Sequence, residues 1–135
     1  MEALNKELFI AAESGDLKAA EECLKNGADV HYRCGWNKQT PLYVALEKNH
    51  KDMAALLVSK GADIKIQYNF ELFNAAESGD LKAAEECLRN GADVHYRGGW
   101  NKQTPLHVAL EKNHKDMAAL LVSKGADIKI QYNFV

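Results

Sequence analysis

The chain has 135 residues, of which 47% are hydrophobic, so it is long enough to bury the core of one ordinary domain. Its 17 basic and 19 acidic residues give a net charge of −2, which argues against binding nucleic acid or anionic membranes. The sequence shows no run of eighteen apolar residues and no signal peptide, and its three cysteines do not suit a disulfide framework. A compact cytoplasmic protein without membrane association is therefore expected.

The sequence repeats itself at an offset of 64 residues. Residues 7–70 recur as residues 71–134, and only four pairs differ: Ile10/Asn74, Lys25/Arg89, Cys34/Gly98 and Tyr43/His107. Each copy holds a weaker repeat, marked by Gly-Ala-Asp segments that begin at Gly27, Gly61, Gly91 and Gly125. A period near 33 residues indicates stacked units. We expect a single domain over residues 1–135, with four repeats at about 7–36, 37–70, 71–100 and 101–135.

The first repeat is expected to contain two short helices. An apolar stripe over residues 8–12 stops before Gly15. Asp16 is then a suitable N-cap for a second helix over residues 17–26, and Gly27 fits a helix end in the left-handed conformation. Isolated helices of about ten residues are unstable in water, so stacking against neighbouring helices must stabilise them.

The second repeat carries a clearer helix start. Thr40 is a natural N-cap for a helix over about residues 41–48, whose first residue is a proline. A partner helix is expected over about residues 51–60. The third and fourth repeats reproduce this arrangement over residues 71–90 and 104–124.

Extended segments are expected between the helix pairs. Residues 64–68 alternate apolar and polar side chains, which is typical of extended chain. The Gly98-Gly99 pair suits the turn of a hairpin in the loop that follows Val94. The predicted unit is therefore helix, helix, hairpin.

These motifs resemble those of the ankyrin-repeat family. Residues 40–45 (Thr-Pro-Leu-Tyr-Val-Ala) and 104–109 (Thr-Pro-Leu-His-Val-Ala) are similar to the opening of that family's first helix, and the Gly-Ala-Asp segments are similar to its close. The resemblance covers the chain from Glu7 onward and implies a mainly α solenoid of stacked helix–turn–helix units with hairpin or loop excursions. One departure is Asn74, because the family and the sister repeats carry an apolar residue there; a polar group at that position needs a partner or water.

Catalytic and metal-binding chemistry is not expected. His31 and Cys34 have a spacing that could suit a metal pair, but two ligands are too few and the second copy has Gly98 in place of Cys34. Cys23 and Cys87 stand where sister repeats have leucine, which favours buried thiols. The resemblance implies a structural role for His107, and no group of residues suggests an enzyme or a cofactor.

The remaining functional signal is a concentration of aromatic and polar side chains in the loops. Tryptophan, tyrosine and arginine often anchor protein interfaces, and the resemblance implies a non-enzymatic protein-binding module whose hairpin tips and first helices form a concave surface. We expect the tryptophans to be exposed, whereas the tyrosines either bind a partner or pack between hairpins. The candidate partner-binding residues are Tyr32, Arg33, Trp36, Asn37, Lys38, Tyr68, Tyr96, Arg97, Trp100, Asn101 and Lys102.

Two further expectations follow from the duplication. Sixty identical pairs in sixty-four also suit an engineered or recently duplicated scaffold with no native partner of its own. In addition, the end of the fourth repeat should match the start of the first repeat in another molecule, which predicts weak, open-ended head-to-tail association. Candidate contact residues at that end are Met117, Leu120 and Leu121, although some of these must instead face their own helix pair.

Overall fold

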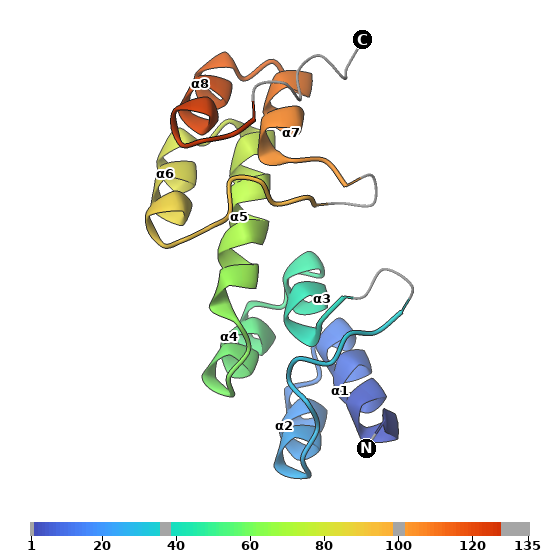
Figure 1. Cartoon of the computed structure of the whole chain (residues 1–135). Coiled ribbons are helices and arrows are strands. Elements are labelled where there is room, and N and C mark those ends of the chain that lie inside the picture. The colour runs from blue at the N-terminus through green and yellow to red at the C-terminus, as the bar shows by residue number, and fades with distance from the viewer. Residues whose placement is uncertain (1, 36–38, 99–101, 128–135) are drawn as a thin grey trace. The chain divides into compact units, whose positions relative to one another are not determined.

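The computed structural model describes residues 2–35, 39–98 and 102–127, and these residues form eight α-helices and no β-strands (Figure 1). By chain contacts the protein divides into two compact units, residues 1–67 and 68–135. The helices are α1 (Glu2–Ser14), α2 (Leu17–Lys25), α3 (Pro41–Glu47), α4 (Lys51–Ser59), α5 (Ile64–Ser78), α6 (Leu81–Arg89), α7 (Pro105–Glu111) and α8 (Lys115–Ser123).

The predicted N-caps of the second helices are confirmed. The side chain of Asp16 accepts a hydrogen bond of 3.1 Å from the amide of Ala19, and Asp80 does the same for Ala83 at the start of α6. These bonds satisfy amides that the first helical turn leaves without an intrahelical partner. At the other end of α2, Gly27 has φ of 98°, the left-handed conformation expected of it.

The Thr-Pro starts of α3 and α7 are also confirmed. The Thr40 side chain accepts a 3.1 Å hydrogen bond from the amide of Tyr43, and each helix has proline in its first turn. In α7 the bonding is reciprocal, because His107 donates its amide to the Thr104 hydroxyl while the Thr104 amide donates to Nδ1 of His107, at 3.3 Å. His107 is therefore a structural residue of a capping box, as the resemblance implied.

The expectation of extended chain over residues 64–68 is wrong, since these residues form the first turns of α5. Asp63 starts the helix: its side chain accepts from the Lys65 amide at 3.0 Å, and its carbonyl accepts from the Ile66 amide at 3.0 Å. A five-residue alternation is too short to distinguish a strand from a helix that continues into an apolar stripe. No glycine or proline interrupts the sequence up to Ser78.

The expected hairpins are reduced to single bridges. Cys34 and Gln39 exchange two backbone hydrogen bonds of 2.8 and 3.2 Å, and Gly98 and Gln103 form the same antiparallel pair in the second unit. Each bridge closes a loop without extending into paired strands in the described residues. The turn expected at Gly98-Gly99 includes Gly99, which lies outside the described residues.

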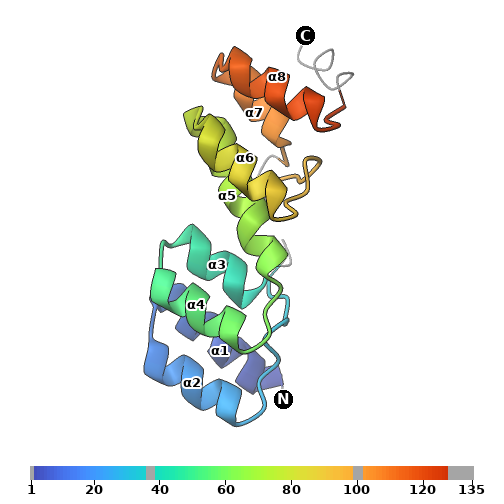
Figure 2. The same cartoon turned by 90° about the vertical axis from the view of Figure 1, so that its left-hand side faces the viewer.

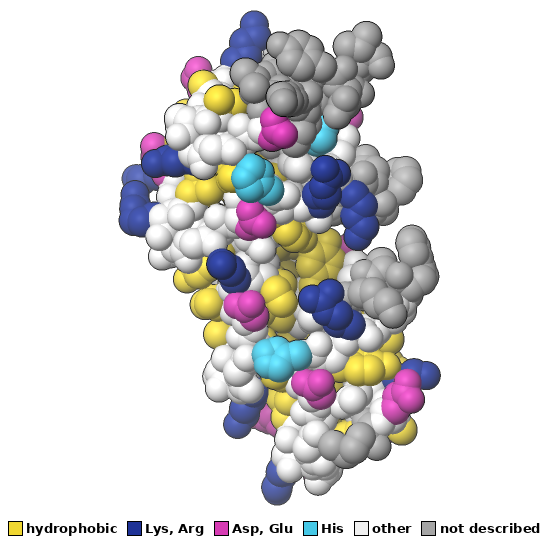
Figure 3. All heavy atoms as spheres, viewed as in Figure 1, with side chains coloured by type: hydrophobic (Ala, Val, Ile, Leu, Met, Phe, Trp, Pro, Cys, Tyr) yellow, Lys and Arg dark blue, Asp and Glu magenta, His cyan; other side chains and the backbone are white. Residues whose placement is uncertain are grey.

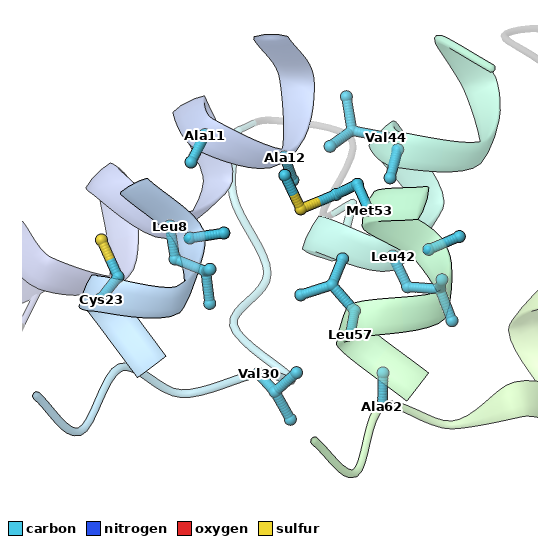
Figure 4. Close-up of a cluster of buried hydrophobic side chains, with 13 residues drawn as sticks. Leu8, Ala11, Ala12, Cys23, Val30, Leu42, Val44, Met53, Leu57 and Ala62 are labelled. Atoms are coloured by element: carbon cyan, nitrogen blue, oxygen red, sulfur yellow. The ribbon is translucent and has the colours of Figure 1, made fainter. Parts of the chain in front are cut away.

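Each unit has its own hydrophobic core. In the first unit, α1 and α2 pack on α3 and α4 (Figure 2). Figure 4 shows Met53 of α4 reaching toward Ala12 of α1. The second unit repeats this core with Met117 of α8 and Ala76 of α5. Asn74, by contrast, lies exposed on α5, so water satisfies its amide.

A close contact joins the two repeats within each unit. In the first unit, Nε2 of His50 lies 3.0 Å from the carbonyl oxygen of Glu13, and the His50 ring packs over Gly15, which has φ of 80°. His114 and the Glu77 carbonyl reproduce the hydrogen bond in the second unit. The histidines at the start of α4 and α8 therefore have a structural role.

Candidate functional site

The first candidate loop, residues 30–40, is fixed to the helices at both of its ends. Before it, the Asp29 amide donates a 2.7 Å hydrogen bond to the side-chain oxygen of Asn5 in α1. The Asp29 side chain in turn accepts from the His31 amide at 2.9 Å, and its carbonyl accepts from the Tyr32 amide at 3.1 Å. The bridge between Cys34 and Gln39 then closes the loop beside α3. The loop is therefore held by hydrogen bonds rather than by a β-ladder.

The second loop, residues 94–104, repeats these bonds and adds an aromatic contact. The Asp93 amide donates to Asn69 of α5 at 2.7 Å. The rings of Phe73 and Tyr96 meet edge to face, with centroids 6.5 Å apart. A Cβ atom at Gly98 would lie only 2.8 Å from the Tyr96 ring, so the absence of a side chain there lets the ring approach the backbone closely.

The candidate partner-binding residues have different environments. Arg33, Arg97 and Lys102 are exposed, and Nη1 of Arg97 donates a 3.4 Å hydrogen bond to the carbonyl of Lys102. Tyr32 and Tyr96 are half-buried. This exposure does not decide between the two alternatives for the tyrosines, which were binding a partner and packing between hairpins. The other loop candidates lie outside the described residues: Trp36, Asn37, Lys38, Trp100 and Asn101.

Tyr68 lies apart from the loops, because its segment is helical. It is half-buried on α5 and lines a hollow of about 370 Å³ together with Asn74, Ala83 and Cys87. Its neighbours in the hollow are partly acidic, including Glu71. Tyr68 is therefore a helix-face residue rather than a loop residue.

Sequence reasoning missed the two asparagines that anchor the loops. Asn5 and Asn69 each bond a backbone amide 24 residues further along the chain. The sequence did hold an indication of this role. Asparagine is common to residues 4–6 and 68–70, whereas its neighbours change from Leu4 and Lys6 to Tyr68 and Phe70. A pair of invariant polar residues in an otherwise altered segment suggests a shared bonding role.

Charge on the visible face is mixed, with basic and acidic side chains interspersed (Figure 3). Among the described residues, no group of three or more His, Cys, Asp or Glu side chains could hold a metal ion. His31 is exposed, and Cys34 is half-buried beside it in sequence. The loops thus present hydrogen-bonding and aromatic groups, which suit recognition of a surface.

His107 gives the fourth repeat a pH-sensitive element. Burial lowers the pKa of His107 below its ordinary value, and the positive charge of Arg97 lowers it further, although Glu111 acts in the opposite direction. The unfolded chain therefore binds a proton more readily than the folded protein. The contribution of neutral His107 to the free energy of unfolding is fully present above about pH 6.5, the ordinary histidine pKa. It is lost as the pH falls through the lower pKa that His107 has in the folded protein.

We expect His107→Tyr to weaken the acid sensitivity of the protein. The variant places in the fourth repeat the residue that Tyr43 provides in the second. On going from about pH 7 to about pH 5, the melting temperature of the wild type should fall by more than that of the variant, because the other histidines are common to both. Calorimetry at both pH values tests this; an identical fall in the two proteins would contradict it.

The three cysteines are free and differ in accessibility. Cys23 and Cys87 are buried, as expected, at 7% and 5% exposure, whereas Cys34 is half-buried in the first loop rather than fully exposed. Burial raises the pKa of the Cys23 thiol, and it raises the pKa of Cys87 to about 11. Thiolate is the reactive form, so Cys34 should be the first to react.

We expect thiol reagents to modify Cys34 alone in the folded protein near pH 8. With a pKa of about 11, Cys87 is thiolate in roughly one molecule in a thousand at that pH. Mass spectrometry of the labelled protein should find one adduct, and Cys34→Gly should remove it by restoring the second copy's residue. Oxidation should likewise give a Cys34-linked dimer. Fast native-state labelling of Cys87 would contradict this assignment.

The described residues contain no helix that is long and apolar enough to cross a membrane. A family model described as ankyrin repeats (3 copies) matches residues 5–68 and again residues 69–132. The two matches follow the 64-residue duplication and together cover nearly all of the chain.

Individual relatives agree with this match. Ankyrin repeat and SOCS box protein 6 from Homo sapiens is 30% identical over 138 residues, covering 95% of this chain and 33% of that protein. An ankyrin repeat and KH domain-containing protein from Caenorhabditis briggsae is 35% identical over 125 residues, covering 92% of this chain and 4% of that protein. An L-asparaginase from Dirofilaria immitis is 29% identical over 123 residues, covering 89% of this chain and 20% of that protein.

The chain thus spans a third or less of the length of these relatives. The part of this chain that they match is the repeat array, which the ankyrin-repeat family model covers almost completely. Both the family model and the folded helix pairs point to the same conclusion. The chain belongs to the ankyrin-repeat family.

Proposed function

We propose that this protein is a non-enzymatic protein-binding module whose four repeats act as one domain over residues 1–135. Ankyrin repeats generally mediate protein–protein interactions. The proposed surface consists of the two loops, residues 30–40 and 94–104, together with the first helices of the repeats. Its anchors are the loop tyrosines, arginines and tryptophans, since these residue types dominate interface energetics.

The observation that carries this proposal is the bonding of each loop before any partner arrives. Asn5 holds Asp29, the Cys34–Gln39 bridge closes the first loop, and Asn69 holds Asp93 in the second unit. Described loop residues that are already held by such bonds lose little conformational entropy on binding. Exposed arginines on such loops are therefore well suited to rigid display.

The test is to recover a partner from the source proteome with the wild-type protein and to compare loop variants against it. Trp36→Ala and Trp100→Ala should each weaken binding by more than about 1 kcal/mol, or about fivefold in Kd. Arg33→Ala should also weaken binding, whereas Glu85→Ala, at an exposed position on α6, serves as a control. Unchanged affinity with a large loss of stability would assign the tryptophans to the core instead.

Catalysis is not part of this proposal. The similarity to the L-asparaginase covers 20% of that protein, and the shared part is an ankyrin array. The described residues that resemble active-site groups have structural tasks: His107 caps α7, and His50 bonds the Glu13 carbonyl. An asparaginase assay of the purified protein should give no turnover above buffer.

A scaffold without a native partner is the second candidate. It is favoured by the identity of 60 residue pairs in 64, which extends to exposed positions. The coding DNA distinguishes the origins, because silent differences between the copies accumulate with age, whereas identical or deliberately recoded copies indicate design.

We also propose a cytoplasmic location and head-to-tail self-association. The three unpaired cysteines favour a reducing compartment. The association would use the two ends of the repeat array.

A further inference from the structure

The fourth repeat carries an apolar groove that is separate from the loops. It lies on α7 and α8, has a volume of about 420 Å³, and exposes much more apolar than polar surface. Of the three candidate contact residues, Met117 and Leu121 are those that face their own helix pair, since both are fully buried in the core. The groove is lined by Leu106, Leu110, Ala118, Ala119, Val122 and Ser123.

The same positions in the first repeat form part of an interface that the structure shows. Counting back by 98 residues, Leu106, Leu110 and Ala118 correspond to Leu8, Ala12 and Ala20, each 0% exposed. The difference is at Leu110 and Ala118, which are half-buried, because Leu106 is itself 1% exposed. Leu8, Ala12 and Ala20 share one buried cluster with Val44 and Met53 of the second repeat (Figure 4). The face that is a groove in the fourth repeat is therefore covered by α3 and α4 in the first.

Ile10 occupies the position in the first repeat that Val44 occupies in the second, 34 residues later. Val44 is 2% exposed because the preceding repeat packs on it, whereas Ile10 is 61% exposed. Among the large hydrophobic side chains of the described residues, Ile10 has the highest exposed fraction. The chain thus presents both halves of a repeat–repeat contact.

We propose that Ile10 of one molecule enters the α7–α8 groove of a second copy, in the way that Val44 of α3 packs in the interface with the preceding repeat, where α3 contacts α1 and α4 contacts α2. This rests on the proposed head-to-tail association and assigns its register. The contact would reproduce between two molecules the packing of one repeat on the next, and because it is heterologous, it continues as an open row.

The start face also limits the strength of the contact. Ala19 stands where the second repeat has Met53, so less apolar volume is available to fill the groove. Glu7 and Glu22 stand where the second repeat has Pro41 and Leu56, and their charges favour water over an apolar groove. Association should therefore appear only at high protein concentration.

The experiment is sedimentation analysis of the full chain over a concentration series into the millimolar range. Ile10→Asn, which introduces the residue that the second copy carries at Asn74, should lower the association constant at least about tenfold. Ala118→Glu should do the same by placing a charge in the groove. In the monomer the Ile10 side chain is exposed and that of Ala118 is half-buried, so neither substitution should change the melting temperature much at low protein concentration.

Two matched controls keep the interpretation specific. Lys115→Glu places a glutamate at an exposed position of the same helix, at a residue that does not line the groove. Leu17→Asn alters an exposed apolar residue whose counterpart in the second repeat, Lys51, is exposed. Neither variant should change association.

The outcomes separate the register from the association itself. A strictly monomeric wild type would overturn both proposals. Association that Ile10→Asn and Ala118→Glu leave unchanged would overturn the register alone. Residues 128–134 repeat residues 64–70, and Ile66 in the earlier copy packs against the first unit's core. The variant Ile130→Asn therefore tests whether the C-terminal residues of the same chain fill the groove instead of a second copy. If Ile130→Asn strengthens association, the chain's own terminus is the occupant and the register is overturned.

Discussion

Leu57→Ala is expected to lower the free energy of unfolding by about 2–5 kcal/mol, the range for a buried leucine replaced by alanine. Leu57 is 0% exposed in α4 and belongs to the first unit's buried cluster. The loss combines transfer of apolar surface to water with a cavity that short helices cannot refill. Because helices of nine residues depend on packing, the variant should melt well below the wild type. Urea unfolding followed by circular dichroism measures the change.

Two comparisons control this result. Leu121→Ala removes the equivalent residue of the second unit, which is also 0% exposed, and should cost a similar amount. Leu17→Ala removes a leucine that is 37% exposed and should cost less than about 1 kcal/mol. Equal effects of Leu57→Ala and Leu17→Ala would show that the described core does not carry the stability.

Gly15→Ala is expected to destabilise the protein by about 2–4 kcal/mol through two separate effects. Gly15 has φ of 80°, where an L side chain is strained, and its Cβ atom would lie 2.8 Å from Nδ1 of His50. The methyl group would therefore push the ring away and disturb its hydrogen bond with the Glu13 carbonyl. Chemical denaturation of the variant gives the total.

Gly61→Ala separates the two effects. Gly61 has φ of 105°, but a Cβ atom there meets nothing within 4 Å, so only backbone strain of about 1–2 kcal/mol is expected. In a His50→Ala background the clash is removed, and Gly15→Ala should then cost about as much as Gly61→Ala. If Gly15→Ala is no worse than Gly61→Ala in the presence of His50, the ring contact has no energetic weight.

Helix starts and stops were predictable from the sequence because their causes are local. The Asp16 cap bonds an amide three residues away, and the Thr40 cap does the same. Gly27 adopts the left-handed conformation at the end of α2 because glycine has no Cβ atom that would clash with the backbone there. The repeat period and the Thr-Pro starts also led correctly to the ankyrin fold.

Other features depend on contacts that the pattern does not record. The start of α5 was misjudged because five alternating residues outweighed the cap at Asp63 and the helix that follows. The loops were expected to be hairpins, but their described residues form one bridge each, and an asparagine distant in sequence holds the start of each loop, such as Asn5 for Asp29. No local propensity predicts a bond across 24 residues.

The comparison of Ile10 with Val44 shows where sequence ceases to determine environment. Both are β-branched aliphatic residues at the same position of a repeat, so the sequence assigns them the same hydrophobic face. Sequence therefore determined the repeat, its caps and the apolar character of that face. Only the tertiary structure decided that Val44 is 2% exposed and Ile10 61%, because burial depends on whether another helix pair packs against the face.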